Sequence, residues 1–450
     1  MGNKNLNLAG KNHWLILCTI FFILFSIGCK EEIVPEAFMP RTEYEAYEHA
    51  LEQANIAQTA LGREWKKAGT KSLKEPIDIN LPFEEEFYWN PNSAEATGYS
   101  FFVQRGLRIE VEIFVNSVDS LLLFTDLFRM RGDSISEWIH VATADIENHR
   151  LEFEPRRDAD YVLRIQPELL RGGRFRILIR EVPSIGFPVT GKNSRAIQSF
   201  FGASRDAGRR RHHGVDIFAA RHTSVVAPSN STVRRVGVGD IGGRYVWLYD
   251  SIRSMSLYFA HLETQEVTTG TRVVAGQIIG TVGNTGNAKT TPPHLHFGIY
   301  SRGPIDPLHF IAETDIEPDK ISGDTLFLGK MVRSKQNVII KSLPTIKSLP
   351  VDTLEKHSMM KVTALAGKFC RVILPNNSSG YIAENQIEII NDPLFQEIAT
   401  EAIVFLETPD KNAIQMTNIK SGDIFEVLGK YKKFIYGKTL GGRNGWILSP

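Results

Sequence analysis

Alternating hydrophobic and polar positions run through much of the chain and predict short β-strands. Between Glu84 and Glu181, segments such as YSFFVQRGLRIEVEIFV, YVLRIQP and RFRILIRE alternate with a period of two, with Gly, Pro, Asn and Asp between them. Alternate residues of a strand face the same side, so each segment has one face for packing and one for solvent. The pattern predicts an antiparallel β-sandwich accessory domain at residues 83–182.

A helical pattern precedes these strands. Apolar residues recur at helical intervals from Tyr44 to Ala54, before Gly62, and Thr42 and Glu45 have the spacing of a capping box. We expect a helix or a helical hairpin there, which together with a tether occupies residues 30–82.

Further β-patterned segments follow the sandwich. Residues 183–312 are rich in glycine and contain VVAPSNSTVRRVGVGDIGGRYVWLYD and HLHFGIY, which predict a second β-domain. The acidic segment ETDIEPDKISGD indicates a linker at residues 313–327. The predicted fold is therefore mainly β and multidomain, after a short helical segment.

The last part of the chain has a duplicated pattern. GYIAENQIEII, from Gly380, and GWILSP, from Gly445, each close a run of short strands. Both endings resemble the closing strand of bacterial SH3-like barrels. Two small SH3-like domains are expected, at residues 328–394 and 395–450, and one larger β-domain is the alternative.

The N-terminus has the pattern of an export signal. Lys4 and Lys11 precede an apolar run that is short for a membrane-spanning helix and ends at Cys29. The SIGC ending resembles the lipobox of bacterial lipoproteins, and the following KEE resembles the surface-export signal of lipoproteins in Bacteroidetes-like bacteria. We expect a lipoprotein signal peptide at residues 1–29 and lipid on Cys29, with an uncleaved signal anchor as the alternative. The resemblance implies an exported lipoprotein at the outer membrane or cell surface, or else on the periplasmic face of the envelope.

Composition and charge narrow the possible functions. A chain of 450 residues is expected to hold two to four domains. Its formal net charge of +1 gives no long-range attraction to nucleic acid, so no nucleic-acid partner is expected. Of its cysteines, Cys18 leaves with the signal and Cys29 carries lipid, so Cys370 has no partner for an internal disulfide.

Three histidines and one carboxylate are the candidate functional residues. In PPHLHFGIY, His294 and His296 face the same side of a strand, where imidazoles make good metal ligands. In HHGVD, a turn at Gly214 that runs into a strand can bring His212 and Asp216 to one point. Together with His296 they would form a three-ligand set that leaves a position open for water, as in catalytic zinc sites. The helical metalloprotease motif His-Glu-x-x-His is absent.

These motifs in this order, HHGVD, YFAHL, GNTGN and PPHLHFG, resemble the lysostaphin-type (LytM-like) zinc endopeptidases over residues 183–312. The family pattern implies one zinc ion held by His212, Asp216 and His296. It implies catalytic roles for His294 and His261 and leaves open which of them is the general base. His213 and Tyr258 are expected to contact substrate. The TTPP before His294 and the Gly298 after the motif depart from the family pattern and concern the shape of the groove.

The resemblance implies a zinc-dependent endopeptidase that hydrolyses peptide cross-links of bacterial peptidoglycan through a metal-activated water. Its partners would be the peptide stems, the envelope membrane through the lipid anchor, and a cell-wall ligand for the SH3-like domains, which could hold substrate or cover the groove. The sandwich resembles the jelly-roll modules that accompany secreted bacterial peptidases. Two alternatives remain: a non-catalytic or autoinhibited wall-binding regulator of another hydrolase, and a surface protease that acts on external proteins.

A basic run lies beside the candidate ligands. Arg205 and Arg209 to Arg211 are interpreted as a solvated loop. The alternative is that they hold the carboxylates of the peptide stem.

Overall fold

The computed structural model describes residues 42–117, 120–130, 138–205, 208–313 and 316–449. The predicted signal peptide, Cys29 and most of the predicted tether lie outside these residues. The described residues divide into two compact units, with the boundary after Asn55. Across the described residues, no helix combines the length and apolar character needed to span a membrane.

Two helices occupy the predicted helical segment. Helix α2 (Glu43–Gln53) belongs to the first unit, and the Thr42 side chain caps it by accepting a hydrogen bond from the Glu45 backbone N–H at 3.1 Å. Helix α3 (Ala60–Lys74) opens the second unit and is capped in the same way by Thr59. Gly62 lies inside α3, where a Cβ would come within 2.2 Å of the Ile56 carbonyl oxygen, so a side chain has no room there.

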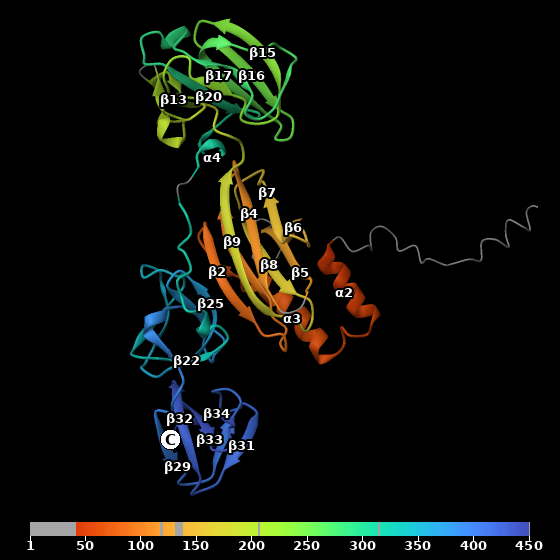
Figure 1. The fold of residues 1–450 in the computed structure, drawn as a ribbon, viewed down its shortest axis with the longest axis vertical. Helices are drawn as coiled ribbons and strands as arrows, with labels where there is room; N and C mark the ends of the chain where they lie inside the picture. Colours follow the sequence, from red (N-terminus) through yellow and green to blue (C-terminus); the bar gives the residue numbers. More distant parts are fainter. Residues whose placement is uncertain (1–41, 118–119, 131–137, 206–207, 314–315, 450) are drawn as a thin grey trace, which may run out of the picture. The chain divides into compact units, whose positions relative to one another are not determined.

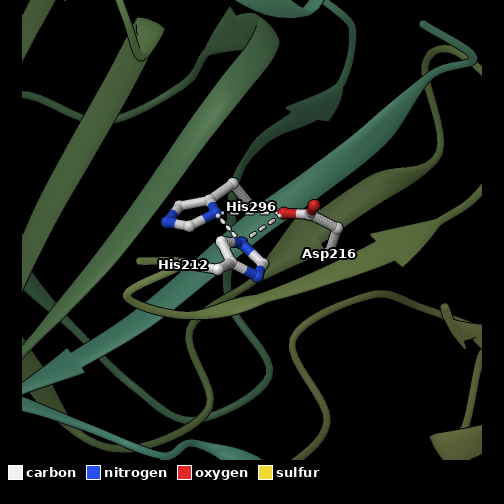
Figure 2. A group of neighbouring side chains, drawn as sticks. All are labelled: His212, Asp216 and His296. Atoms are coloured by element: carbon white, nitrogen blue, oxygen red, sulfur yellow. Dashed lines mark hydrogen bonds and ion pairs between the residues drawn. The ribbon is translucent and has the colours of Figure 1, made fainter. Parts of the chain in front are cut away.

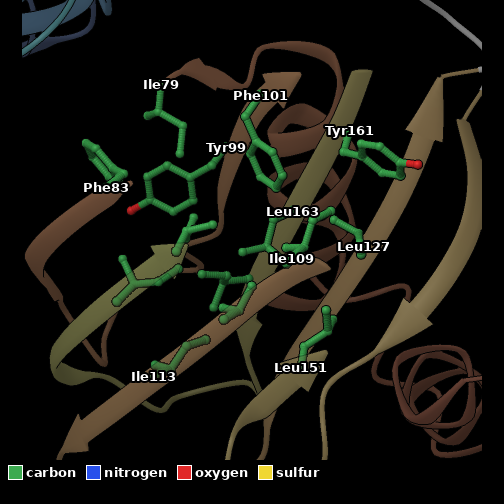
Figure 3. Packing of buried hydrophobic residues seen from close by; sticks show 14 of the residues in the cluster. Ile79, Phe83, Tyr99, Phe101, Ile109, Ile113, Leu127, Leu151, Tyr161 and Leu163 are labelled. Carbon is green, nitrogen blue, oxygen red and sulfur yellow. The ribbon is translucent and has the colours of Figure 1, made fainter. Parts of the chain in front are cut away.

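Two sheets face each other after α3 and form a β-sandwich. One sheet has the strand order β1-β3-β8-β5-β6. The second sheet contains the strands β2-β9-β4-β7 in this order. Their bounds are β1 (Ile77–Asp78), β2 (Phe83–Trp89), β3 (Thr97–Val103), β4 (Leu107–Asn116), β5 (Leu123–Met130), β6 (Trp138–Thr143), β7 (Arg150–Phe153), β8 (Ala159–Pro167) and β9 (Gly173–Pro183). The core between the sheets takes residues from both, such as Leu163 from β8 and Ile109 from β4, each fully buried (Figure 3).

A second β-domain follows, built on a sheet of order β10-β13-β20-β17-β16-β15-β18 (Figure 1). The strands on this path are β10 (Ile197–Ser199), β13 (Val215–Phe218), β15 (Ser231–Gly239), β16 (Gly243–Asp250), β17 (Met255–Gln265), β18 (Arg272–Val273) and β20 (His294–Tyr300). The short elements around it are β11 (Ser204–Arg205), β12 (Arg210–Arg211), β14 (Ser224–Val226), β19 (Ile278–Val282), β21 (Pro304–Ile305) and α4 (Leu308–Ile311). Fully buried Leu248, Phe259 and Phe297 pack one face of this sheet into a core, which leaves the other face for the site.

The C-terminal part contains two groups of strands with the same order. The first runs β22-β25-β26-β27-β23-β24, with β28 beside β22, and the second runs β29-β32-β33-β34-β30-β31. The first group comprises β22 (Met331–Ser334), β23 (Val338–Lys341), β24 (Pro350–Leu354), β25 (Met359–Ala366), β26 (Phe369–Ile373), β27 (Ser379–Ala383) and β28 (Ile387–Ile389). The second comprises β29 (Phe395–Ile398), β30 (Ile403–Leu406), β31 (Gln415–Ile419), β32 (Ile424–Tyr431), β33 (Phe434–Thr439) and β34 (Asn444–Leu448). The motifs at Gly380 and Gly445 occupy equivalent strands, β27 and β34.

The first C-terminal group shares a sheet with the sandwich. Strand β2 pairs with β25, with Glu86 opposite Leu365 and Phe87 opposite Ala364. The sheet thus continues from the predicted sandwich into the first predicted SH3-like domain. The prediction of a mainly β fold with several sheets after a short helical segment is confirmed.

Candidate metal centre

Two paired strands bring the candidate ligands together. Strands β13 and β20 are antiparallel, and their register sets Asp216 directly opposite His296. Both side chains point away from the core because their neighbours Val215 and Leu295 are fully buried on the other face. His212 approaches from the turn before β13.

Gly214 makes this turn possible. A Cβ at this position would lie 2.4 Å from the Phe297 carbonyl oxygen and 2.9 Å from the His296 ring. Only a residue without a side chain lets the turn come this close to β20. The glycine between the histidines and Asp216 therefore has a structural reason.

One atom of each of the three candidate ligands faces the other two (Figure 2). His212 Nε2 lies 3.0 Å from Asp216 Oδ1 and 3.0 Å from His296 Nδ1, and His296 Nδ1 lies 3.0 Å from Asp216 Oδ1. His212 and Asp216 are buried, and His296 is half-buried. Three atoms at this spacing can all lie within about 2.1 Å of a common point, which is the usual Zn–N distance.

The protonation states of the cluster also favour binding of a cation. His212 Nδ1 lies 2.9 Å from the Phe200 carbonyl oxygen, so this nitrogen donates and Nε2 of the neutral ring presents a lone pair. Burial alone would raise the pKa of Asp216, but the facing imidazoles of His212 and His296 lower it far more, so the carboxylate is ionised at neutral pH. Of the three facing atoms, His212 Nε2 presents a lone pair and Asp216 Oδ1 belongs to a charged carboxylate, so only His296 Nδ1 could carry a proton. Two imidazoles and one carboxylate suit zinc, so the residues present fit this ion.

The second oxygen of Asp216 has a partner that the sequence did not suggest. Arg205 donates from Nη2 to Asp216 Oδ2 at 2.5 Å and to Ser199 Oγ at 2.5 Å. The interpretation of the basic run as a solvated loop is therefore wrong for Arg205, because the β11–β12 hairpin folds this side chain back onto the ligand. This contact orients the carboxylate so that Oδ1 faces His212 and His296.

The two candidate catalytic histidines face each other beside the ligands. His261 Nδ1 and His294 Nδ1 each lie 2.9 Å from a backbone carbonyl oxygen, of Thr285 and Pro292 respectively. Both Nδ1 atoms therefore donate, and the Nε2 atom of each neutral ring is free to accept a proton. The two ring centroids are 5.0 Å apart.

His261 is held in an unusual conformation and environment. Its φ of +62° is in the left-handed region that non-glycine residues rarely adopt, and its backbone N–H donates to the Gly242 carbonyl at 2.8 Å. Burial, and next the neighbouring His294, lower the pKa of His261 to about 4. The ring is therefore neutral at pH 7.

The site opens into a groove of about 740 Å³. The expected substrate-contacting residues, His213 and Tyr258, both line it, as do Arg209 to Arg211. The Tyr258 ring stands edge-on to His296 at a centroid distance of 5.9 Å. Sequence reasoning missed Tyr300 in this lining, although alternation from His294 through His296 to Tyr300 sets it on the same face of β20.

Comparison with known proteins identifies this domain. Residues 210–307 match the model of peptidase family M23. The L-Ala--D-Glu endopeptidase of Bacillus subtilis is 36% identical over 122 residues, which is 25% of this chain and 37% of that protein. The peptidoglycan DD-endopeptidase ShyC of Vibrio cholerae is 35% identical over 94 residues, 21% of each chain. The match thus spans well under half of either relative.

Among solved structures, the catalytic domain of lysostaphin from Staphylococcus simulans is 32% identical, with a TM-score of 0.23 over 25% of this chain and 89% of that one. Residues 210–307, which match the family model, contain the candidate ligand cluster and both catalytic candidates, and the resemblance to this peptidase family read from the sequence is confirmed. Residues 210–307 are therefore a domain of peptidase family M23.

Proposed function

We propose that this protein is a zinc-dependent endopeptidase that hydrolyses peptide cross-links of bacterial peptidoglycan. The observation that carries the proposal is the triangle of ligand atoms with 3.0 Å sides beside two imidazoles whose Nε2 atoms are free. The names of the similar proteins, an L-Ala--D-Glu endopeptidase and a peptidoglycan DD-endopeptidase, support the substrate.

The proposed roles follow from the donor atoms. His212 through Nε2, His296 through Nδ1 and Asp216 through Oδ1 would hold one zinc ion. When bound, zinc lowers the pKa of a water ligand and polarises the scissile carbonyl. Either His261 or His294 accepts the proton of the attacking water at its Nε2 atom; the ring protonated in this way then donates to the developing oxyanion and passes the proton to the leaving amine. The hydrogen bonds from their Nδ1 atoms to carbonyl oxygens keep both rings in the required tautomer.

The test uses purified protein and purified sacculi. We expect release of soluble muropeptides that a chelator abolishes and added zinc restores. His294→Ala and His261→Ala are each expected to reduce turnover by a factor of about 100 or more while one zinc per chain remains bound. His49→Ala, an exposed histidine of α2, is the control and keeps full activity. Full activity in both site variants contradicts the assignment, and a zinc-loaded protein that releases nothing supports a non-catalytic role instead.

We also propose that Cys29 carries a lipid that anchors the exported protein in the outer membrane or at the cell surface. The basic and apolar segments that end at Cys29 support this. Labelling with a radioactive fatty acid should mark the wild-type chain and fail to mark Cys29→Ser. Equal labelling of both chains contradicts the anchor.

The two C-terminal strand groups are proposed to be SH3-like domains that bind a cell-wall ligand. Their common strand order supports an origin from one duplicated unit. Deletion of residues 395–450 should weaken sedimentation of the protein with sacculi and leave hydrolysis of a small soluble muropeptide unchanged. Unchanged sedimentation contradicts this role.

A further inference from the structure

An aromatic row continues the groove away from the ligand cluster. We define it as Trp247 of β16, Tyr258 of β17 and Tyr300 of β20. Trp247 and Tyr258 are directly opposite in the β16–β17 register, with ring centroids 4.4 Å apart. Trp247 and Tyr300 are 5.1 Å apart. All three side chains are half-buried, so part of each ring is accessible to solvent.

The strand registers set this row on the same face as the ligands. Ala260 pairs with His296, and Tyr258, two residues earlier on β17, pairs with Gly298. Alternate residues share a face and are about 7 Å apart, so Tyr258 lies one such step from the ligand cluster and Tyr300 two steps from His296, about 13 Å along β20. Tyr258 and Tyr300 themselves line the groove. Row and ligand cluster thus form one continuous surface.

The row is not needed for the core. The core of this domain is on the opposite face of the sheet, where Val246, Leu248 and Phe259 are fully buried. No hydrogen bond to the hydroxyl of Tyr258 or Tyr300 is formed within the described residues, so both hydroxyls can bond to a ligand.

Charged groups lie on β15, the strand next to β16, where Arg235 is directly opposite Trp247. The guanidinium of Arg235 lies 5.6 Å from the ring centroid of Tyr245, and that of Arg234 lies 4.7 Å from Tyr249. Both arginines are exposed. Flat rings with hydroxyl and guanidinium donors around them suit a ligand that has an apolar face and a polar edge.

We propose that the aromatic row binds a sugar ring of the peptidoglycan glycan strand, next to the peptide that is cleaved. This inference rests on the proposed function. A pyranose ring has C–H groups on its faces and hydroxyl and amide groups at its edge, and its faces stack on aromatic rings. The stem peptide consists of small and charged residues, which offer no comparable partner for three rings. The spacing of the row from His296 corresponds to about two to four extended residues between the sugar and the hydrolysed bond.

The test compares two substrates that differ only in the sugar. One is a cross-linked muropeptide that carries its disaccharides, and the other is the same peptide after an amidase has removed them. We expect the wild type to have a kcat/KM about tenfold higher on the sugar-bearing substrate, mainly through KM. Trp247→Leu, which keeps an apolar side chain but no flat face, should lose this advantage and stay within about twofold of wild type on the free peptide.

Two further variants control for folding and for general effects. Trp247→Tyr keeps a flat ring and should retain most of the preference. Trp138→Ala changes a half-buried tryptophan of the sandwich and should leave both substrates unaffected. Equal kcat/KM of the wild type on the two substrates overturns the proposal, and so does an equal loss on both in Trp247→Leu, since the row would then bind the peptide.

A binding measurement separates this proposal from the proposed function. The disaccharide alone, N-acetylglucosaminyl-N-acetylmuramic acid, is titrated against the protein and followed by saturation-transfer NMR, which needs no turnover. Binding by the wild type and its loss in Trp247→Leu support the sugar site even if neither substrate is cleaved. Absence of binding to the wild type overturns it even if both substrates are cleaved.

Discussion

At the scale of a single residue, a substitution at Gly214 tests how tightly the candidate metal centre is packed. Since a Cβ here would come within 2.4 Å of the Phe297 carbonyl oxygen and 2.9 Å of the His296 ring, Gly214→Ala must displace a ligand or the strand that carries it. We expect zinc affinity to fall by a factor of about 10 to 100, measured by competition with a chromophoric chelator. Gly303→Ala is the matched control, because no atom lies within 4 Å of its would-be Cβ. An equal affinity in both variants contradicts the packing argument.

His261 makes stability depend on pH. Burial, and next His294, lower its pKa in the folded protein from 6.5 to about 4. Below pH 6.5 this histidine is protonated in the unfolded chain but still neutral in the folded protein. As the pH is lowered, the free energy of unfolding therefore decreases until the pH reaches the folded pKa of about 4. In metal-free protein, the wild type should lose up to roughly 2 kcal/mol more than His261→Gln between about pH 7 and about pH 5.

Urea unfolding followed by circular dichroism at the two pH values measures this difference. His213→Gln, which replaces an exposed histidine of the same domain, should lose stability with pH as the wild type does. If wild type and His261→Gln lose equal amounts, the ring is not held neutral by its surroundings.

The convergence of the three candidate ligands could be predicted from sequence because their residues follow local rules. His294 and His296 share a face by the two-residue repeat of a strand, and Gly214 signals a turn. The turn could bring His212 to Asp216, and the resemblance to known endopeptidases singled out His212 rather than His213. The ion pair of Arg205 with Asp216 was missed, since a hairpin that folds back over its own neighbours leaves no periodic signal.

Strand β20 is the element that holds the site. Its inward side chains, Leu295 and Phe297, are fully buried, and they fix the outward direction of His296. Phe297→Ala would leave a cavity in the core and should lower the free energy of unfolding by about 3–5 kcal/mol, with loss of zinc at ordinary concentrations. Phe102→Ala, at a 53% exposed position of β3, should cost less than about 0.5 kcal/mol. Thermal unfolding with metal analysis measures both, and similar losses in the two variants contradict the assigned role of β20.

Element type was easier to predict than element pairing. The alternating pattern gave strands across the sandwich and the peptidase family M23 domain, because one face of each strand is packed. It did not indicate that β2 pairs with β25, because the period of a strand carries no information about a partner nearly 280 residues away. The aromatic alternation of Tyr245, Trp247 and Tyr249 was visible in the sequence, yet the face to which it belongs follows only from the sheet order.

At the scale of the whole molecule, a buried charge lies where the sandwich meets the first C-terminal strand group. Glu85 of β2 is fully buried and accepts hydrogen bonds from the hydroxyls of Tyr99 at 2.7 Å and Tyr381 at 3.1 Å. Arg371 of β26 lies 3.0 Å from the same carboxylate. The carboxylate therefore joins two strands of the sandwich, β2 and β3, to two strands of the C-terminal group, β26 and β27. Because β2 also pairs with β25, we expect the two regions to unfold as one cooperative unit.

Removal of the Arg371 charge should show whether the sandwich and the first C-terminal strand group unfold together. Arg371→Met leaves Glu85 buried without its cation and should destabilise the protein by about 3–5 kcal/mol. Adding Glu85→Gln removes the unpaired charge, keeps an oxygen acceptor for one tyrosine hydroxyl and offers an NH2 donor to the oxygen of the other, so the double variant should recover most of the loss. Calorimetry should show the sandwich and the first C-terminal group unfolding in one transition that shifts down in Arg371→Met and back up in the double variant. Two separate transitions in the wild type, or a double variant no more stable than Arg371→Met, would mean that these regions are independent and that the shared sheet does not transmit stability between them.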